Sequence, residues 1–365
     1  MTMQGNKAEK EKLELQEHYQ IIIKKITDGS LVFFLGAGVN LCDRLPGQAF
    51  EPGKFLPSGK ELAAHLAKEF SFPLKCSHCG KTLSVLKVKC AHCKMGFTAA
   101  EIPDLLRVSE YVSLKYGLVD LYRALHRLFA GSYAPTSLHT FIAHLPCILK
   151  NKGYRPARLL VVTTNYDDLM ERAFVAVGQP FEMLTYAAQG TDHGKFLYWP
   201  SNADRPTIMP KPVGPIDPDH SGLSDEYPII LKVHGAINLA DAKRDHFVIQ
   251  EDDYIDYMVD MTDICNVLPT LLVDQLKTSS LLFLGYSLTD WNLRVILHRI
   301  WKRESREFRP QSWSIQLDPN EIDRKLWERR NVEFVDLSSY TELSLQKYVA
   351  ALNERVQNLP ESKAA

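Results

Sequence analysis

The most reactive side chains of this sequence stand at the ends of short apolar runs. Asn165 and Asp167 follow the run 159–162, and His234 follows the run 229–231. Uninterrupted apolar runs of this length are typical of strands that are buried on both faces of a parallel sheet. Ligands of such sheets bind beyond the carboxyl ends of the strands. We therefore expect an amide, a carboxylate and an imidazole to share one crevice, where they could hold a ligand and transfer a proton.

Glycine turns follow two further apolar runs. Gly36, Ala37 and Gly38 end one run, and Gly285 and Ser287 end another. Glycine allows peptide N–H groups to come close to an anion such as a pyrophosphate. A tight turn without a ligand explains so short a motif equally well, and the third glycine of the dehydrogenase fingerprint is missing. A dehydrogenase that transfers hydride is therefore disfavoured.

The polar residues, taken singly, also have structural explanations. Asn165 and Asp167 are residue types that commonly cap the amino end of a helix, and a helix is expected to follow them. His234 could be a hydrogen-bonded structural residue at the end of its strand, although imidazole is the side chain best matched to proton transfer near neutral pH. Both explanations stay open at this level.

Four cysteines form the most specific local pattern of the chain. Cys76 and Cys79 form one C-x2-C pair, and Cys90 and Cys93 form a second pair after ten intervening residues. Two such pairs supply four thiolates to one tetrahedral ion, and a site closed in this way is structural rather than catalytic. The odd total of seven cysteines fits a reducing compartment better than a disulfide framework. We therefore predict a structural zinc site within 73–98.

The bulk composition is that of a globular cytoplasmic protein. A chain of 365 residues can bury a large core, and its 45% hydrophobic and 24% charged content is ordinary. The formal net charge of -1 supplies no general attraction to nucleic acid or to an anionic membrane, so no direct nucleic-acid binding is expected. No apolar stretch approaches the length of a membrane span, and the amino-terminal segment lacks a signal-peptide core.

The periodicity predicts an α/β fold with a Rossmann-like, mostly parallel sheet, helices on both faces, a zinc-knuckle insertion and a helical subdomain. We expect an amino-terminal helix over 1–30, a catalytic domain over 31–310, and carboxy-terminal strands and a helix over 311–365 that complete the domain. The zinc-knuckle insertion covers 73–98. A segment rich in proline and glycine over 189–228 is expected as a loop, either over the crevice or for a partner, or as a surface insertion without a role.

The order of these strand ends resembles the sirtuin family, in particular its bacterial sirtuin-like branch. Residues 36–38 resemble the nucleotide-binding G-A-G turn of the family, and residues 163–167 resemble its T-Q-N-x-D segment. Residues 135–139 are similar to its helix-positioning P-N-x-x-H segment. Residues 233–235 resemble the segment with the catalytic base, and residues 285–287 resemble the late G-x-S that contacts the adenosine side of NAD. The ordered set is far more specific than any one of its members.

The resemblance implies a role for each of these residues. The catalytic residues would be Asn165, Asp167 and His234, with His234 as the general base. Asn40 stands where the family usually has serine, so it would contact phosphate or ribose instead. The residues that the resemblance assigns to NAD binding are Gly36, Ala37, Gly38, Asn40, Thr164, Gly285 and Ser287.

The resemblance also implies an activity. The branch suggests an NAD glycohydrolase of antiphage defence that cleaves the nicotinamide–ribose bond and depletes NAD after infection is sensed. It suggests a homo-oligomer and a separately encoded partner, with a HerA-type ATPase as first choice and a short Argonaute as second. The G-x-P-D-F-R segment of the deacylases has no counterpart here, and the cysteines precede the asparagine motif instead of following the histidine. Two alternatives remain: a non-enzymatic module that binds NAD or another nucleotide, and an NAD-dependent protein deacylase.

Overall fold

A nine-stranded sheet forms the centre of the protein. The computed structural model describes residues 3–45, 47–76, 78–83, 90, 92–95, 104–155, 158–201, 206–209, 222–261, 267–286, 288, 291–301, 309–340 and 343–362. In spatial order the strands are β13 (Val332–Asp336), β12 (Ser312–Gln316), β11 (Ser280–Leu284), β1 (Leu31–Leu35), β4 (Leu160–Thr163), β8 (Ile229–Lys232), β5 (Glu182–Tyr186), β6 (Phe196–Trp199) and β7 (Thr207–Ile208). Neighbours from β13 to β5 pair in parallel, and β6 and β7 extend the edge as antiparallel strands.

The four predicted central strands are confirmed. Every residue of β1, β4, β8 and β11 is buried, which agrees with their uninterrupted apolar sequences. These strands are buried because helices cover both faces of this part of the sheet. Side chains on either face are therefore shielded from water. The predicted class, an α/β fold with a mostly parallel sheet and helices on both faces, is confirmed as well.

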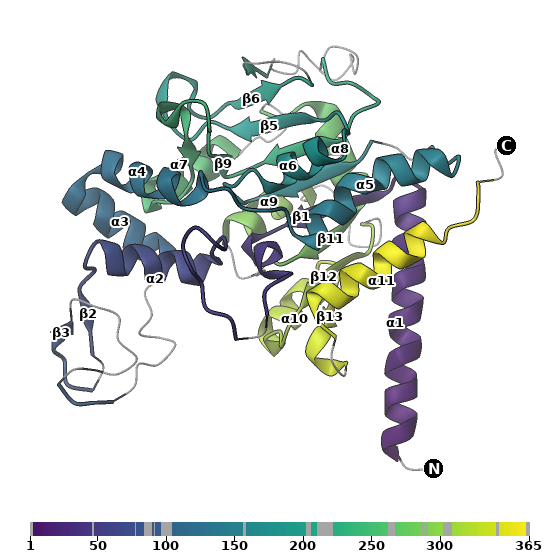
Figure 1. Ribbon diagram of the computed structural model, residues 1–365, viewed down its shortest axis with the longest axis horizontal. Helices are drawn as coiled ribbons and strands as arrows, with labels where there is room; N and C mark the ends of the chain where they lie inside the picture. The colour runs from purple at the N-terminus through teal and green to yellow at the C-terminus, as the bar shows by residue number, and fades with distance from the viewer. Residues whose placement is uncertain are drawn as a thin grey trace.

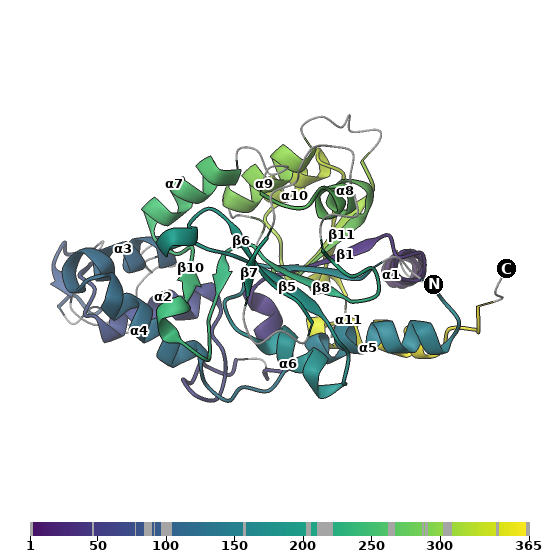
Figure 2. The same cartoon turned by 90° about the horizontal axis from the view of Figure 1, so that it is seen from above.

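Two helical layers enclose the sheet (Figure 2). The helices of one layer are α7 (Glu251–Asp260), α8 (Thr270–Thr278), α9 (Trp291–Trp301) and α10 (Glu321–Glu328). The helices of the other layer are α1 (Met3–Thr27), α5 (Ser137–Asn151), α6 (Leu169–Ala176) and α11 (Leu345–Gln357). Alternate side chains of the central strands enter these two cores, which are separate apolar clusters. Among the described residues no helix combines the length and the apolar character needed to cross a membrane.

A helical subdomain lies beside the sheet (Figure 1). It consists of α2 (Gly59–Glu69), α3 (Leu105–Tyr116) and α4 (Leu118–Phe129), and a reciprocal capping box between Ser58 and Glu61 starts the first of them. Its core continues into the hairpin of β9 (Gly235–Ala236) and β10 (His246–Phe247). The short hairpin of β2 (Leu74–Lys75) and β3 (Thr82–Leu83) carries the first cysteine pair.

The expectation of a loop over 189–228 needs correction. This segment contains β6 and β7, which pair with β5 and with each other and so widen the sheet. Phe196 and Tyr198 are buried, whereas Leu197 and Trp199 are only half-buried, so the segment has the two-residue period of a strand. The surrounding prolines and glycines hid this short period in the sequence. Residues 202–205 and 210–221 of the segment lie outside the described part of the chain.

Candidate active site

The parallel sheet brings the predicted strand ends together. Because β1, β4 and β8 are neighbours and run in the same direction, Gly36, Asn165 and His234 follow adjacent carboxyl ends. The backbone N–H of Thr164 donates to the carbonyl oxygen of Leu35 at 3.3 Å, which ties the turn after β4 to the turn after β1. The sequence expectation that these groups share one edge of the sheet agrees with this arrangement.

The carboxylate of Asp167 has two hydrogen-bond partners that explain its position. One oxygen accepts from the backbone N–H of Leu169 at 3.1 Å, at the start of α6. The other oxygen accepts from Asn40 Nδ2 at 2.9 Å. Asp167 therefore accepts from the first backbone N–H of the helix, although Asp168 holds the N-cap position, and it also orients an asparagine from the glycine turn. These contacts give Asp167 a structural role, and its role in catalysis stays a prediction.

Asn40 and Asn165 join the turns that follow β1 and β4. Both residues are at least nine-tenths buried, and Asn165 Nδ2 donates to the carbonyl oxygen of Gly36 at 3.3 Å. Within the described part of the chain, Asn40 Oδ1 is buried and accepts no hydrogen bond. A buried acceptor of this kind costs free energy unless another group donates to it. A ligand hydroxyl is a suitable donor.

The glycine turn is explained by the close approach of two strand ends. It begins a short 3-10 helix, η1 (Ala37–Leu41). Gly36 donates to the carbonyl oxygen of Leu284 at 3.1 Å, and Gly38 donates to that of Gly285 at 2.8 Å. A Cβ on Gly38 would lie 2.6 Å from the same Gly285 oxygen, so no larger residue fits. These two N–H groups therefore bind the end of β11, whereas the sequence alone led us to expect that they bind an anion. Ser287, the last residue of the predicted NAD set, lies outside the described residues.

His234 is buried between the end of β8 and helix α7. Its side chain is 3% exposed, and its ring meets the rings of Tyr254 and Tyr257 edge-on, with centroids 5.8 and 5.4 Å away. Its carbonyl oxygen accepts from Val248 N at 3.0 Å. Gly235, which follows, has a φ of +86°, and a Cβ there would lie 2.1 Å from a carbonyl oxygen of β10. The tight turn thus fixes the backbone of His234 at the carboxyl edge of the sheet.

A buried ion pair under the Asn165 turn was not anticipated from the sequence. Lys232 is 1% exposed, and its ammonium group donates to the carbonyl oxygen of Asp167 and to Glu171 Oε1, each at 2.5 Å. Burial raises the pKa of Glu171, and the neighbouring Lys232 acts in the opposite direction. A lysine within an otherwise apolar strand was the available signal, because a buried charge needs a partner.

A second support comes from the amino end of α5. His139 is 2% exposed, and its Nδ1 lies 2.8 Å from Thr136 Oγ1 and accepts from Thr136 N at 3.2 Å. The Thr136 hydroxyl also lies 3.3 Å from the carbonyl oxygen of Val39 in the glycine turn. Burial lowers the pKa of His139 to about 4, so the imidazole is neutral near pH 7. This segment therefore fixes α5 against the glycine turn, which fits a positioning role.

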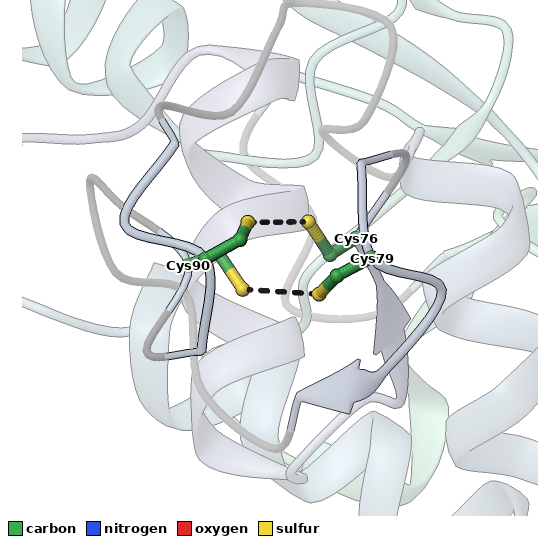
Figure 3. A group of neighbouring side chains, drawn as sticks. Cys76, Cys79 and Cys90 are labelled. Atoms are coloured by element: carbon green, nitrogen blue, oxygen red, sulfur yellow. Dashed lines mark hydrogen bonds between the residues drawn. The ribbon is translucent and has the colours of Figure 1, made fainter.

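The four predicted zinc ligands form one cluster (Figure 3). The sulfur atoms of Cys76, Cys79, Cys90 and Cys93 all lie within 4.8 Å of one another. The backbone N–H of Cys93 and that of His92 lower the pKa of Cys90 to about 6, which favours a thiolate. Four sulfurs at this separation fit a tetrahedral ion such as zinc. The side chain of His92 is not part of the cluster.

Comparison with known proteins identifies a domain in the chain. Residues 159–335 match the family model of the SIR2-like domain. The match covers slightly less than half of the chain and identifies this part of it as a SIR2-like domain. This sirtuin-like chain is 24% identical over 205 residues to "Defense-associated sirtuin 2" of Bacillus subtilis. The match covers 54% of this chain and 17% of that protein, so the chain corresponds to a small part of its relative. The resemblance deduced from the ordered strand ends is confirmed at the level of the family.

The family match and the site overlap in part. The matched segment 159–335 contains Asn165, Asp167, His234 and Gly285. The glycine turn after β1 and the cysteine cluster precede the matched segment. A SIR2-like domain implies use of NAD, and the relative is by its name a defence protein.

Proposed function

We propose that this sirtuin-like chain is an NAD glycohydrolase that converts NAD and water to nicotinamide and ADP-ribose. The observation that carries the proposal is the position of Asn165 and His234 at the carboxyl ends of the adjacent strands β4 and β8, within a SIR2-like domain. Both side chains are buried, so they act in a site that excludes bulk water.

The chemistry needs few groups from the protein. The positive charge on the pyridinium makes nicotinamide a good leaving group, so no general acid is required. When the C–N bond breaks, its electron pair returns to nicotinamide, and the sugar becomes oxocarbenium-like. The protein must hold the ribose of NAD in a fixed position and deprotonate a nucleophile on the opposite face of the sugar.

Each site residue has a proposed task in this reaction. His234 is the general base and takes a proton from water or from a ribose hydroxyl. Asn165 positions the water and the ribose. Asp167 orients the site through its hydrogen bond with Asn40.

The remaining NAD contacts are proposed for the turns after β1, β4 and β11. They would come from Gly36, Ala37, Gly38, Asn40, Thr164, Gly285 and Ser287. The four clustered cysteines would hold one zinc ion with a structural role, away from the reaction.

We also propose that the activity serves antiphage defence in the cytoplasm. The printed name of the relative supports a defence role, and a toxic NAD hydrolase needs restraint until infection. A separately encoded partner would provide that restraint or release. A HerA-type ATPase is the first choice and a short Argonaute the second, with a homo-oligomer of this chain as the working unit.

The test is product analysis with matched variants. The purified chain is incubated with NAD, and nicotinamide and ADP-ribose are measured by chromatography. His234→Ala should lower the rate by about 10²- to 10⁴-fold, the usual contribution of a positioned general base. Asn165→Ala should lower it by about 10²-fold, because the water and the ribose lose their fixed position. The controls His298→Ala and Asn151→Ala change exposed residues of the same types and should leave the rate unchanged.

A second readout covers a chain that is restrained when isolated. NAD is measured in cells that express wild-type protein or His234→Ala during phage infection, and only the wild type should deplete it. Hydrolysis that survives in both site variants would refute the assignment. Tight NAD binding without depletion in either readout would point to the nucleotide-binding module, and nicotinamide release that requires an acetyl-lysine peptide would point to the deacylase.

A further inference from the structure

A cavity of about 880 Å³ lies beside the antiparallel edge of the sheet, and none of the residues of the proposed NAD site lines it. Strands β5, β6 and β7, helix α4 and the segment 236–246 line it. We call it the β5–β7 cavity. Gly36, Asn165 and His234 do not line it, and its volume is in the range of small-molecule sites.

The floor of the β5–β7 cavity is apolar and partly aromatic. Leu197 and Trp199 of β6 face it, together with Met183 of β5 and Ile208 of β7. Tyr122 of α4 adds a second aromatic ring from the wall. Within the described part of the chain, no residue of the two helical layers lines the cavity, and Leu197 and Trp199 stay half-buried. Flat rings bind well on such surfaces, since aromatic side chains offer large contact areas.

Two buried polar atoms of the cavity have no partner within the described part of the chain. Thr185 is 3% exposed, and its hydroxyl makes no hydrogen bond there. His246 Nδ1 is also buried without a partner. Buried polar groups are almost always hydrogen-bonded, and leaving one unpaired is costly. A bound ligand with polar atoms on its ring or sugar would satisfy both.

The charges around the cavity favour an anionic ligand. Lys243 is exposed at the cavity, and no carboxylate among the described residues lies within ion-pair distance of it. Arg123 and Arg244 also line the cavity, and their carboxylate partners are Asp120 and Asp241 on their own segments.

The two carboxylates that line the cavity are already engaged. Asp245 accepts from Asn238 N at 2.6 Å and lies 2.8 Å from His126 Nδ1. Asp192 pairs with Lys195 at 3.1 Å. Neither carboxylate is left to bind a cationic ligand, whereas the ammonium group of Lys243 has no carboxylate partner among the described residues.

We propose that the β5–β7 cavity binds a small ligand with a flat aromatic ring and an anionic group, the class to which nucleoside monophosphates belong. The ring lies on the floor around Trp199, polar atoms of the ligand bond to Thr185 and His246, and the anionic group meets Lys243. This site is independent of the proposed hydrolysis of NAD.

The test uses AMP as the probe, with adenosine and ribose 5-phosphate as the arms that lack the anion or the ring. Affinities for the full chain are measured by calorimetry. Thr185→Val keeps the shape of the side chain and should weaken AMP about fivefold to tenfold, the usual worth of one hydrogen bond. Trp199→Ala should weaken AMP by roughly tenfold to a hundredfold, as for loss of base stacking. Lys243→Ala should weaken AMP and leave adenosine unchanged, and the exposed Lys325→Ala is its control.

The proposed NAD site provides the decisive comparison. Asn40→Ala alters that site alone and should leave AMP affinity unchanged. AMP affinity that falls in Asn40→Ala but not in Thr185→Val would place AMP in the NAD crevice and overturn the proposal. Equal affinity for adenosine and AMP would overturn the anionic half of it, and no AMP binding at millimolar concentration would overturn it entirely.

Discussion

Lys232 and Glu171 form an ion pair that is buried beneath the Asn165 turn, and removing the cation alone should be costly. Lys232→Met keeps the aliphatic part of the side chain but leaves the Glu171 carboxylate without its partner. Breaking a buried pair in this way costs about 3–5 kcal/mol. An unfolding entropy of about 2.1 cal/mol/K per residue over 365 residues corresponds to roughly 0.8 kcal/mol/K. The midpoint of thermal unfolding should therefore fall by roughly 4–7 °C.

The loss of stability in Lys232→Met should depend on pH in a defined direction. Burial already raises the folded pKa of Glu171, and without Lys232 it rises further. A folded state that holds the proton more tightly than the unfolded chain loses stability as pH rises above the unfolded value of about 4.3. The difference in stability between Lys232→Met and wild type should thus be small near pH 5 and should grow as the pH rises toward 8.

Two further variants make this prediction refutable. Lys195→Met removes a half-exposed lysine that pairs with Asp192 at 3.1 Å, and a surface pair of this kind is worth 1 kcal/mol or less. The double variant Glu171→Leu with Lys232→Met removes both charges and should recover most of the lost stability. If Lys232→Met loses no more than Lys195→Met at pH 8, or if the double variant is the least stable of the three, the reasoning is wrong.

Two other outcomes follow from the packing of the glycines and cysteines. Gly38→Ala places a Cβ 2.6 Å from the Gly285 carbonyl oxygen and should cost about 1–3 kcal/mol, whereas Gly59→Ala meets open space; equal melting temperatures for the two would contradict the close approach of β1 and β11. Cys90→Ser should reduce bound zinc well below one ion per chain by elemental analysis, with the exposed Cys147→Ser as control; a full zinc content in Cys90→Ser would speak against the cluster as the metal site.

The centre of the fold could be predicted because burial on both faces leaves a direct trace in the sequence. The run 31–35 shows no alternation, which only a strand covered on both sides requires. The edge of the sheet leaves a weaker trace. In β6 only every second residue is buried, and the strand is four residues long. So short a period is easily lost among neighbouring prolines, which is why 189–228 was expected as a loop.

The supports of the site were harder to predict than its polar residues. Asn165 and His234 could be found because each directly follows an apolar run. The partner of Lys232 is 61 residues away on α6, and only the packing of α6 against β8 brings the two together. An ion pair of this kind depends on tertiary structure alone, so the sequence offers the unusual lysine but not its partner.

The glycine turn shows how one sequence pattern can have two physical causes. Glycine is required where a backbone approaches a phosphate, and it is equally required where two backbones approach each other. Here the second cause is sufficient, since the N–H groups of Gly36 and Gly38 donate to the end of β11. The contacts of Asn40 distinguish between the two ligand groups, phosphate and ribose, that its residue type left open. An ionised carboxylate can only accept hydrogen bonds, so it must be the Nδ2 group of Asn40 that faces Asp167. The buried oxygen Oδ1 of Asn40 is then left to accept a hydrogen bond from a ligand. An acceptor oxygen repels a phosphate but accepts a hydrogen bond from a hydroxyl group. We therefore propose that Asn40 contacts ribose rather than phosphate.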